Sequence, residues 1–217
     1  MKFRGPLVTL SAVAVLGAGL MFANISQEQA PVVTGTPVAA PPQTTAIIAS
    51  PAPASPSFPA KADYVGKITT AKGVITLDIA IEGDKAVAYA CDGSAIESWM
   101  RGPALNGTVS LTSKDKTGRL EGRLDGTAVV GTLWIGAKKW DFTAQPAQSP
   151  AGLYVYEQDG VRGSWIVDAS GKATGVLRRD DGSTAPAPGL AIGVDYANTV
   201  IDGNTVIAQR VEGSSDV

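Results

Sequence analysis

Few side chains in this sequence could carry out chemistry. Histidine is absent, which removes Ser-His-Asp and Cys-His catalysis as well as histidine metal ligation. The single cysteine, Cys91, would need a nearby cation or a helix amino terminus to lower the pKa of its thiol. Cys91 alternates in phase with Val87 and Tyr89, so we expect a buried thiol and not a nucleophile. An intermolecular disulfide is the remaining alternative for Cys91, because a lone cysteine allows no internal one.

Two groups of acidic residues are the other candidates for catalysis. Asp180 and Asp181 follow two arginines, and Asp78, Glu82 and Asp84 lie along one expected strand and its turn. Glycosidases need two carboxylates across a cleft, and calcium loops need several spaced oxygen ligands. Neither pattern is present, so we expect both groups on a solvated surface. We therefore assign no catalytic residue, no metal site and no cofactor.

The tryptophans are the best candidates for ligand contact. Trp134 alternates out of phase with Leu133 and Ile135, which predicts that it lies on the opposite face of its strand. An aromatic ring on an accessible sheet face can stack on a sugar or an apolar ligand. We take Trp134, Trp165 and Trp99 as the candidate ligand-binding residues, with burial in the core as the competing interpretation.

Charge argues against nucleic acid as a partner. The formal net charge is −2, and no lysine–arginine cluster exceeds a pair. The sequence therefore offers no basic field for a phosphate backbone.

The amino-terminal segment predicts export. Lys2 and Arg4 precede an apolar stretch at residues 6–23, which as a helix with a rise of ~1.5 Å per residue would span about 27 Å. The basic flank places the amino terminus in the cytoplasm. Two interpretations of residues 1–26 stay open, an uncleaved transmembrane anchor and a cleaved signal peptide. Both place the remainder outside the cytoplasmic membrane, either anchored through residues 6–23 or secreted.

Residues 27–62 are expected to form a disordered linker. From Gln29 to Ala60 there is no charged residue, and eight of the 14 prolines fall there. Proline removes backbone donors and alanine offers little surface to bury, so no core can form.

Residues 63–212 carry the pattern of a β domain, followed by a short disordered tail at residues 213–217. Ile75, Leu77, Ile79 and Ile81 alternate with mostly polar residues, as expected for a strand with one buried face. Asp-Gly pairs such as Asp159-Gly160 separate further alternating runs, and this pairing is typical of tight hairpins.

Repeated hairpins predict an all-β fold in which an antiparallel meander closes into a small barrel or a barrel-like sandwich. One short helix is also expected. Ser94 and Glu97 form a capping-box pattern, and Ile96, Trp99 and Met100 follow at helical spacing.

Several short segments resemble a group of actinobacterial exported proteins of unknown function. They are residues 88–93, Trp99, residues 131–134, residues 151–154 and residues 163–167. The resemblance covers most of residues 64–182 and implies an extracytoplasmic β domain. It implies no catalytic residue.

These features favour a non-catalytic module of the cell envelope that binds a glycan, a lipid or a protein partner. One alternative is an envelope hydrolase that uses an acidic pair or Cys91. Another is a carrier of a small apolar ligand, which requires a hollow barrel. A filled barrel with exposed aromatic residues would favour the binding module.

Overall fold

The computed structural model describes residues 56–193 and 196–217. The predicted anchor or signal peptide at residues 1–26, and the predicted linker as far as residue 55, lie outside these ranges. All regular structure within them is β-strand, and they contain no helix long and apolar enough to cross a membrane. The prediction of an all-β fold is confirmed.

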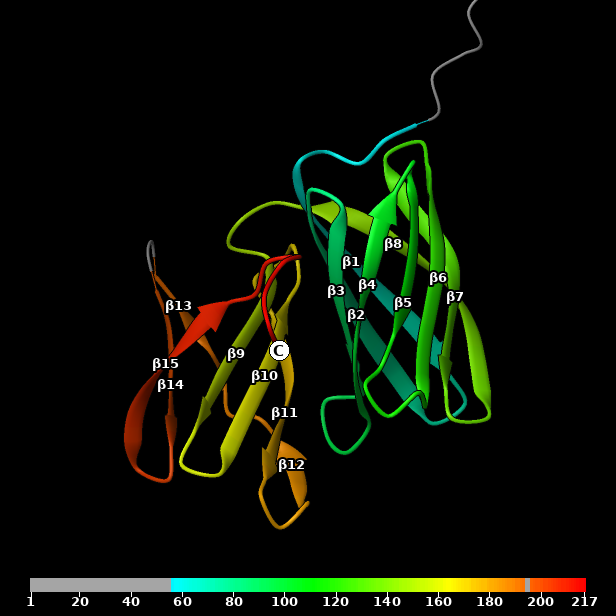
Figure 1. Ribbon diagram of the computed structural model, residues 1–217. Helices are drawn as coiled ribbons and strands as arrows, with labels where there is room; N and C mark the ends of the chain where they lie inside the picture. The colour runs from blue at the N-terminus through cyan, green and yellow to red at the C-terminus, as the bar shows by residue number, and fades with distance from the viewer. Residues whose placement is uncertain (1–55, 194–195) are drawn as a thin grey trace, which may run out of the picture. The chain divides into compact units, whose positions relative to one another are not determined.

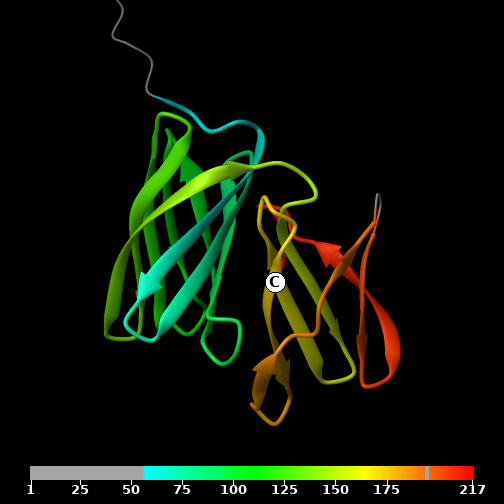
Figure 2. The ribbon, with the colours of Figure 1, turned by 180° about the vertical axis from the view of Figure 1, so that it is seen from behind.

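The first eight strands close into an antiparallel barrel (Figures 1 and 2). Each strand pairs with the next, and β1 closes the ring by pairing with β8, with Tyr64 opposite Pro146. The strands are β1 (Lys61–Thr70), β2 (Gly73–Glu82), β3 (Lys85–Cys91), β4 (Glu97–Leu105), β5 (Thr108–Thr112), β6 (Gly118–Asp125), β7 (Ala128–Ile135) and β8 (Lys138–Ala147).

The remaining strands form a second antiparallel sheet, so the expected single barrel is only half of the domain. The order across this sheet is β12-β11-β10-β9-β15-β14-β13. The strands are β9 (Gly152–Gln158), β10 (Val161–Val167), β11 (Ala173–Arg179), β12 (Thr184–Pro186), β13 (Ala191–Ile192), β14 (Ala197–Ile201) and β15 (Asn204–Arg210).

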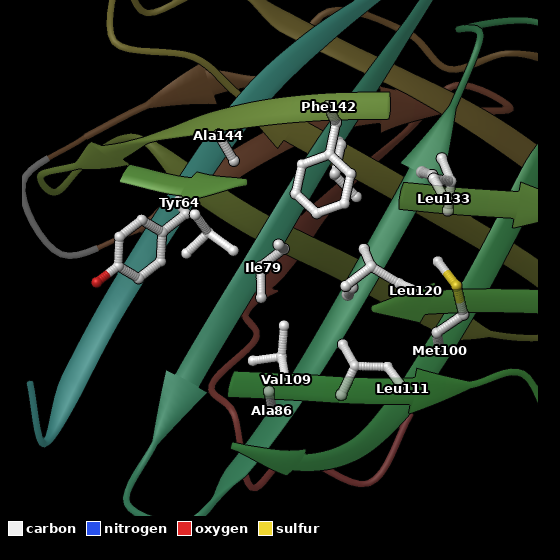
Figure 3. Close-up of a cluster of buried hydrophobic side chains, with 14 of the residues drawn as sticks. Tyr64, Ile79, Ala86, Met100, Val109, Leu111, Leu120, Leu133, Phe142 and Ala144 are labelled. Atoms are coloured by element: carbon white, nitrogen blue, oxygen red, sulfur yellow. The ribbon is translucent and has the colours of Figure 1, made fainter. Parts of the chain in front are cut away.

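The barrel is filled by side chains (Figure 3). Each of the strands β1 to β8 contributes to one apolar cluster inside the barrel. The alternation predicted for β2 is confirmed on this inner face. Burial of these side chains removes the space that a carrier of apolar ligands would need inside the barrel. The buried cluster includes Tyr64, Ile75, Leu77, Ile79, Ile81, Met100, Leu111, Leu120, Leu133 and Phe142.

The outer face of β2 is buried as well, which contradicts the expectation of a solvated polar face. Thr76, Asp78 and Ala80 are all under 4 % exposed. β9 and β10 of the second sheet lie against this face of β2. Asp78 is therefore not a surface residue, because the second sheet covers it. The alternation within β2 does not reveal this second layer.

The predicted short helix after Ser94 is wrong, because Glu97–Leu105 is strand β4. Asp92 Oδ1 accepts the backbone N–H groups of Ser94, Ala95 and Ile96, each at 2.9 Å, and so holds a turn in place of a helix cap. Trp99 and Met100 then point to opposite faces of β4. Pairing with β3 outweighs the local helical spacing.

The second sheet has its own apolar core around Trp165. The indole of Trp165 lies over Gly163 and Gly175, where any added Cβ atom would come within 3.0 Å of the ring. Its Nε1–H donates to Pro188 O at 2.8 Å, which satisfies the one polar atom of the ring.

Residues 213–217, expected to be a disordered tail, lie against the barrel. Gly213 is buried beside Glu82, Ser214 hydrogen-bonds to the Glu82 carboxylate, and Asp216 pairs with Arg101 at 2.6 Å. Local composition does not reveal these contacts, because they are made with strands distant in the sequence.

Candidate functional site

The barrel and the second sheet meet at an apolar seam. Val87, Tyr89 and Cys91 of β3 pack against Leu153, Ile166, Val176 and Val211. Cys91 has no exposed surface, and burial raises the pKa of its thiol to about 11. The prediction that Cys91 is a core residue is confirmed, and its thiol is poorly placed to act as a nucleophile.

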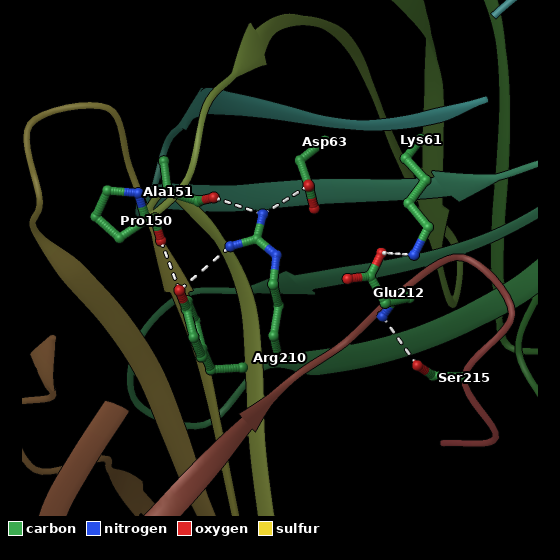
Figure 4. A network of polar contacts seen from close by, with 8 residues as sticks. Lys61, Asp63, Pro150, Ala151, Arg210, Glu212 and Ser215 are labelled. Carbon is green, nitrogen blue, oxygen red and sulfur yellow. Dashed lines mark hydrogen bonds and ion pairs between the residues drawn. The ribbon is translucent and has the colours of Figure 1, made fainter. Parts of the chain in front are cut away.

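An arginine fixes one edge of the seam (Figure 4). The Nη2 atom of Arg210 donates to Asp63 Oδ2 at 2.7 Å and to Ala151 O at 2.9 Å, and Nη1 donates to the Tyr154 hydroxyl at 3.2 Å. Tyr154 in turn donates to Pro150 O at 2.8 Å. Because Asp63 belongs to β1 and Arg210 to β15, this network holds the two sheets together.

Asp78 lies close to this network but is not part of its hydrogen bonding. Its side chain has no exposed surface, and neither carboxylate oxygen has a partner within the described residues. Burial raises the pKa of Asp78 well above its ordinary value, and the nearby charge of Asp63 raises it further, while Arg210 opposes both. The pair Asp63 and Asp78 thus lies beneath the second sheet and not across an open cleft, where a glycosidase would need it.

The other acidic group is at the surface, as predicted. Asp180 and Asp181 are exposed, and Asp181 Oδ1 accepts the backbone N–H of Ser183 at 2.8 Å in the turn after β11. Arg179 does not pair with them but binds Asp202 through both Nη atoms, at 2.9 and 2.8 Å. The two arginines therefore pair with carboxylates distant in the sequence, Arg179 with Asp202 and Arg178 with Glu97, and not with the neighbouring aspartates.

A candidate site is a groove at the end of the seam, with a volume of about 620 Å³. We call it the seam groove. Its size falls within the range of small-molecule sites. Strand β4 and the turn between β5 and β6 supply one wall, and β10 and β11 supply the other. The lining residues are Glu97, Ser98, Trp99, Ser113, Lys114, Asp115, Thr117, Arg162 and Arg178.

Trp99 and Arg162 line the seam groove from opposite walls and contact each other. The guanidinium carbon of Arg162 lies 4.5 Å from the centroid of the Trp99 ring, a cation–π contact across the seam. The Tyr89 ring lies 4.5 Å from the Trp99 ring, with an angle of 38° between the ring planes. The Trp99 ring therefore contacts the Arg162 guanidinium and the Tyr89 ring, and it does not offer a free face for a sugar ring.

Several hydrogen-bond donors of this pair have no acceptor. Nε and Nη2 of Arg162 and Nε1 of Trp99 are buried without a partner in the described part of the chain. Only Nη1 of Arg162 is engaged, at 3.1 Å from Glu157. Because buried donors without acceptors are costly, enclosed ordered water is the partner that these atoms call for.

The carboxylates of the seam groove are already engaged. Glu97 accepts from Arg178 and, at 3.0 Å, from the Tyr89 hydroxyl. Asp115 accepts from Ser113 at 2.6 Å and from Thr117 at 2.8 Å, and these bonds lower the pKa of Asp115 to about 2. Lys114 and the two arginines give the lining one more positive charge than negative.

The three tryptophans proposed for ligand contact lie in different settings, and only Trp99 lines the seam groove. Trp134 lies on the outer face of β7, as predicted, with Arg119 over its ring at 4.7 Å. Trp165 is 1 % exposed within the core of the second sheet, so its ring is not accessible to a ligand. The structure does not bring the three together.

Sequence reasoning missed Arg162, Arg178 and Lys114. A usable signal existed for Arg162, because it shares a strand face with Ser164 and the buried Ile166. A charged side chain on an otherwise buried face suggests a boundary or a site. No comparable signal marks Lys114, which lies in an ordinary polar turn.

Comparison of the chain with protein-family models, with curated proteins and with solved structures gives no match.

Proposed function

We propose that this protein is an exported, non-catalytic binding module of the cell envelope, and that its seam groove binds an anionic glycan. The observation that carries the proposal is the cationic lining of the seam groove, where Arg162, Arg178 and Lys114 outnumber two carboxylates that neighbouring donors already hold. Carboxylate, phosphate and hydroxyl oxygens are the acceptors that these cations would bind.

The chemistry of the lining suits a sugar bearing a carboxylate or a phosphate. Arginine binds such groups through two parallel hydrogen bonds, and the cation–π contact with Trp99 helps to fix the position of the Arg162 guanidinium. The hydroxyl of Thr117 and the ammonium of Lys114 line the same hollow as additional polar groups for glycan hydroxyls.

Binding without catalysis is favoured by the state of the acidic and thiol groups. Glu97 and Asp115 are held by neighbouring donors, and Cys91 and Asp78 are buried beneath the second sheet. A hydrolase would need a carboxyl group that is free to exchange protons with a bound substrate.

Location outside the cytoplasmic membrane is part of the proposal and is supported by the apolar stretch at residues 6–23 after Lys2 and Arg4. Protease treatment of intact spheroplasts is the direct test. Digestion of residues 56–217 from outside is expected. Full protection in intact spheroplasts, with digestion after lysis, would contradict export.

The binding test is a calorimetric titration of the full chain with polygalacturonate as an anionic polysaccharide and with dextran as a neutral one. Saturable binding of polygalacturonate alone is expected, and Arg162→Gln should weaken it about tenfold because it removes charge-assisted hydrogen bonds. Arg123→Gln is the matched control, since Arg123 is exposed and does not line the seam groove.

Equal binding of both polysaccharides, or equal affinity in Arg162→Gln and Arg123→Gln, would overturn the proposal. Shortening of the polysaccharide during the titration would overturn the non-catalytic part of it.

A further inference from the structure

A second hollow lies at one mouth of the barrel. It has a volume of about 200 Å³, and we call it the mouth pocket. The turns between β1 and β2 and between β7 and β8 form its rim, together with the loop between β3 and β4. The lining residues are Thr70, Ala71, Lys72, Gly73, Val74, Ile75, Asp92, Ile96, Lys138 and Trp140.

The mouth pocket is at the opposite end of the barrel from the point where the chain joins it. Ala60 O accepts the N–H of Gly83 in the turn between β2 and β3, and Phe58 packs edge-on against Tyr64. Strand β1 then runs the length of the barrel (Figure 1) and ends at Thr70, which is part of the pocket lining. The segment just before β1 is therefore held away from the mouth pocket.

The floor of the mouth pocket is apolar. Ile75 belongs to the barrel core, and Trp140 of β8 packs against that core. Val74 is 46 % exposed and is one of the few large apolar side chains left open to solvent within residues 56–193 and 196–217. Covering an exposed apolar side chain beside a concave apolar floor lowers the free energy, because apolar surface is removed from water.

The rim of the mouth pocket is basic. Lys72 lies in the turn between β1 and β2 and Lys138 is the first residue of β8, and neither forms an ion pair within the described residues. Asp92 is the only acid in the lining, and its Oδ1 already accepts three backbone N–H groups of the β3–β4 loop. Two free ammonium groups above an apolar floor complement a ligand with an anionic head and an apolar tail.

We propose that the mouth pocket binds a small amphiphilic carboxylate, with the alkyl chain on Ile75, Val74 and Trp140 and the carboxylate between Lys72 and Lys138. The volume restricts the ligand to a short or medium chain, because 200 Å³ is below the usual range for drug-sized ligands. The site is separate from the seam groove, since the two share no lining residue.

The test is titration of the full chain with octanoate, followed by calorimetry, with octanol and octylamine as neutral and cationic probes of equal length. Octanoate is expected to bind at least tenfold more tightly than octanol, and octylamine is expected not to bind. A second readout uses octanoate brominated at its terminal carbon. It should quench tryptophan fluorescence in wild type and lose most of that effect in Trp140→Phe.

Variants of the rim and floor separate this site from general adsorption. Lys138→Glu should weaken octanoate binding about three- to tenfold, while Lys139→Glu, the exposed neighbour outside the lining, should leave it unchanged. Val74→Asp, at an exposed position, should also weaken it.

Equal affinity for octanoate and octanol, or equal loss in Lys138→Glu and Lys139→Glu, would overturn the proposal. Binding to anionic lipid vesicles without binding of monomeric octanoate would overturn it as well. None of these results depends on polygalacturonate binding, so failure of one site is distinguishable from failure of the other.

Discussion

Asp78 is unusual because its carboxyl group is buried in the seam without a partner among the described residues. It is fully buried and has no hydrogen-bond partner within the described ranges, and burial raises its pKa. The folded state therefore holds a proton on Asp78 more tightly than the unfolded chain does. As a consequence, the free energy of unfolding should fall as the pH rises above the ordinary range of a carboxyl group.

Asp78→Asn should remove this pH dependence, because the amide has nearly the same shape and carries no proton to lose. We expect its free energy of unfolding to exceed that of wild type by about 1–3 kcal/mol at pH 7, with the difference shrinking as the pH falls. Urea unfolding at several pH values measures it. Asp84→Asn, at an exposed turn, is the control. A variant that is less stable than wild type at pH 7 would contradict an unpaired, buried Asp78.

The thiol of Cys91 offers a second test at this scale. Because burial raises its pKa to about 11 and leaves no exposed surface, the folded protein should react with a thiol reagent such as dithionitrobenzoate only through unfolding. The reaction rate in native buffer should be at least a hundredfold below that in denaturant. Rapid reaction of the native protein would show that the seam opens easily.

The loop before strand β4 depends on one residue for its conformation. The structure assigns the turn to Asp92, whereas the capping-box pattern assigned it to Ser94. Asp92→Ala should lower the free energy of unfolding by about 1–2 kcal/mol, and Ser94→Ala should change it by less than about 0.5 kcal/mol. Thermal or urea unfolding distinguishes them, and the reverse order would favour a helix over a strand.

The strands and turns were predictable because they depend on short-range patterns. The alternation of β2 and β3 and the Asp-Gly turns are local. Asp159 and Gly160 both have positive φ values, as a tight hairpin requires. The helix prediction failed at β4 because spacing of three and four residues also fits a strand whose two faces are both apolar. Only the pairing of Trp99 with Tyr89 decides between them.

Closure of the meander into a barrel was predicted from the number of hairpins and is confirmed, but the register of closure and the second sheet were not predictable from local patterns. The pairing of Tyr64 with Pro146 joins strands far apart in the sequence, and no local pattern specifies it. The seam groove follows from the same long-range packing, since Trp99 and Arg162 meet only when the second sheet covers β3 and β4. Sequence analysis therefore identified Trp99 but not the arginine that it supports.

Within residues 56–193 and 196–217, ion pairs fix the seam between the barrel and the second sheet. Arg210 joins β15 to Asp63 of β1, and Lys67 joins β1 to Asp168 at 2.6 Å. Arg210→Gln should lower the free energy of unfolding by about 2–3 kcal/mol, since it leaves Asp63 without its cation. Arg123→Gln, at an exposed pair, should change it by less than about 0.5 kcal/mol. Equal effects in urea unfolding would mean that the Arg210 network does not secure the seam.

Binding of an anionic glycan in the seam groove can be measured by nuclear magnetic resonance. The four tryptophan indole N–H signals are followed during titration of the full chain with short oligogalacturonates. The Trp99 signal should shift with saturation, because Trp99 lines the seam groove and a bound ligand changes the surroundings of its indole. The Trp165 signal should stay in place, since its N–H is bonded to Pro188. A shift of Trp134 without a shift of Trp99, or no saturable shift at all, would contradict binding in the seam groove.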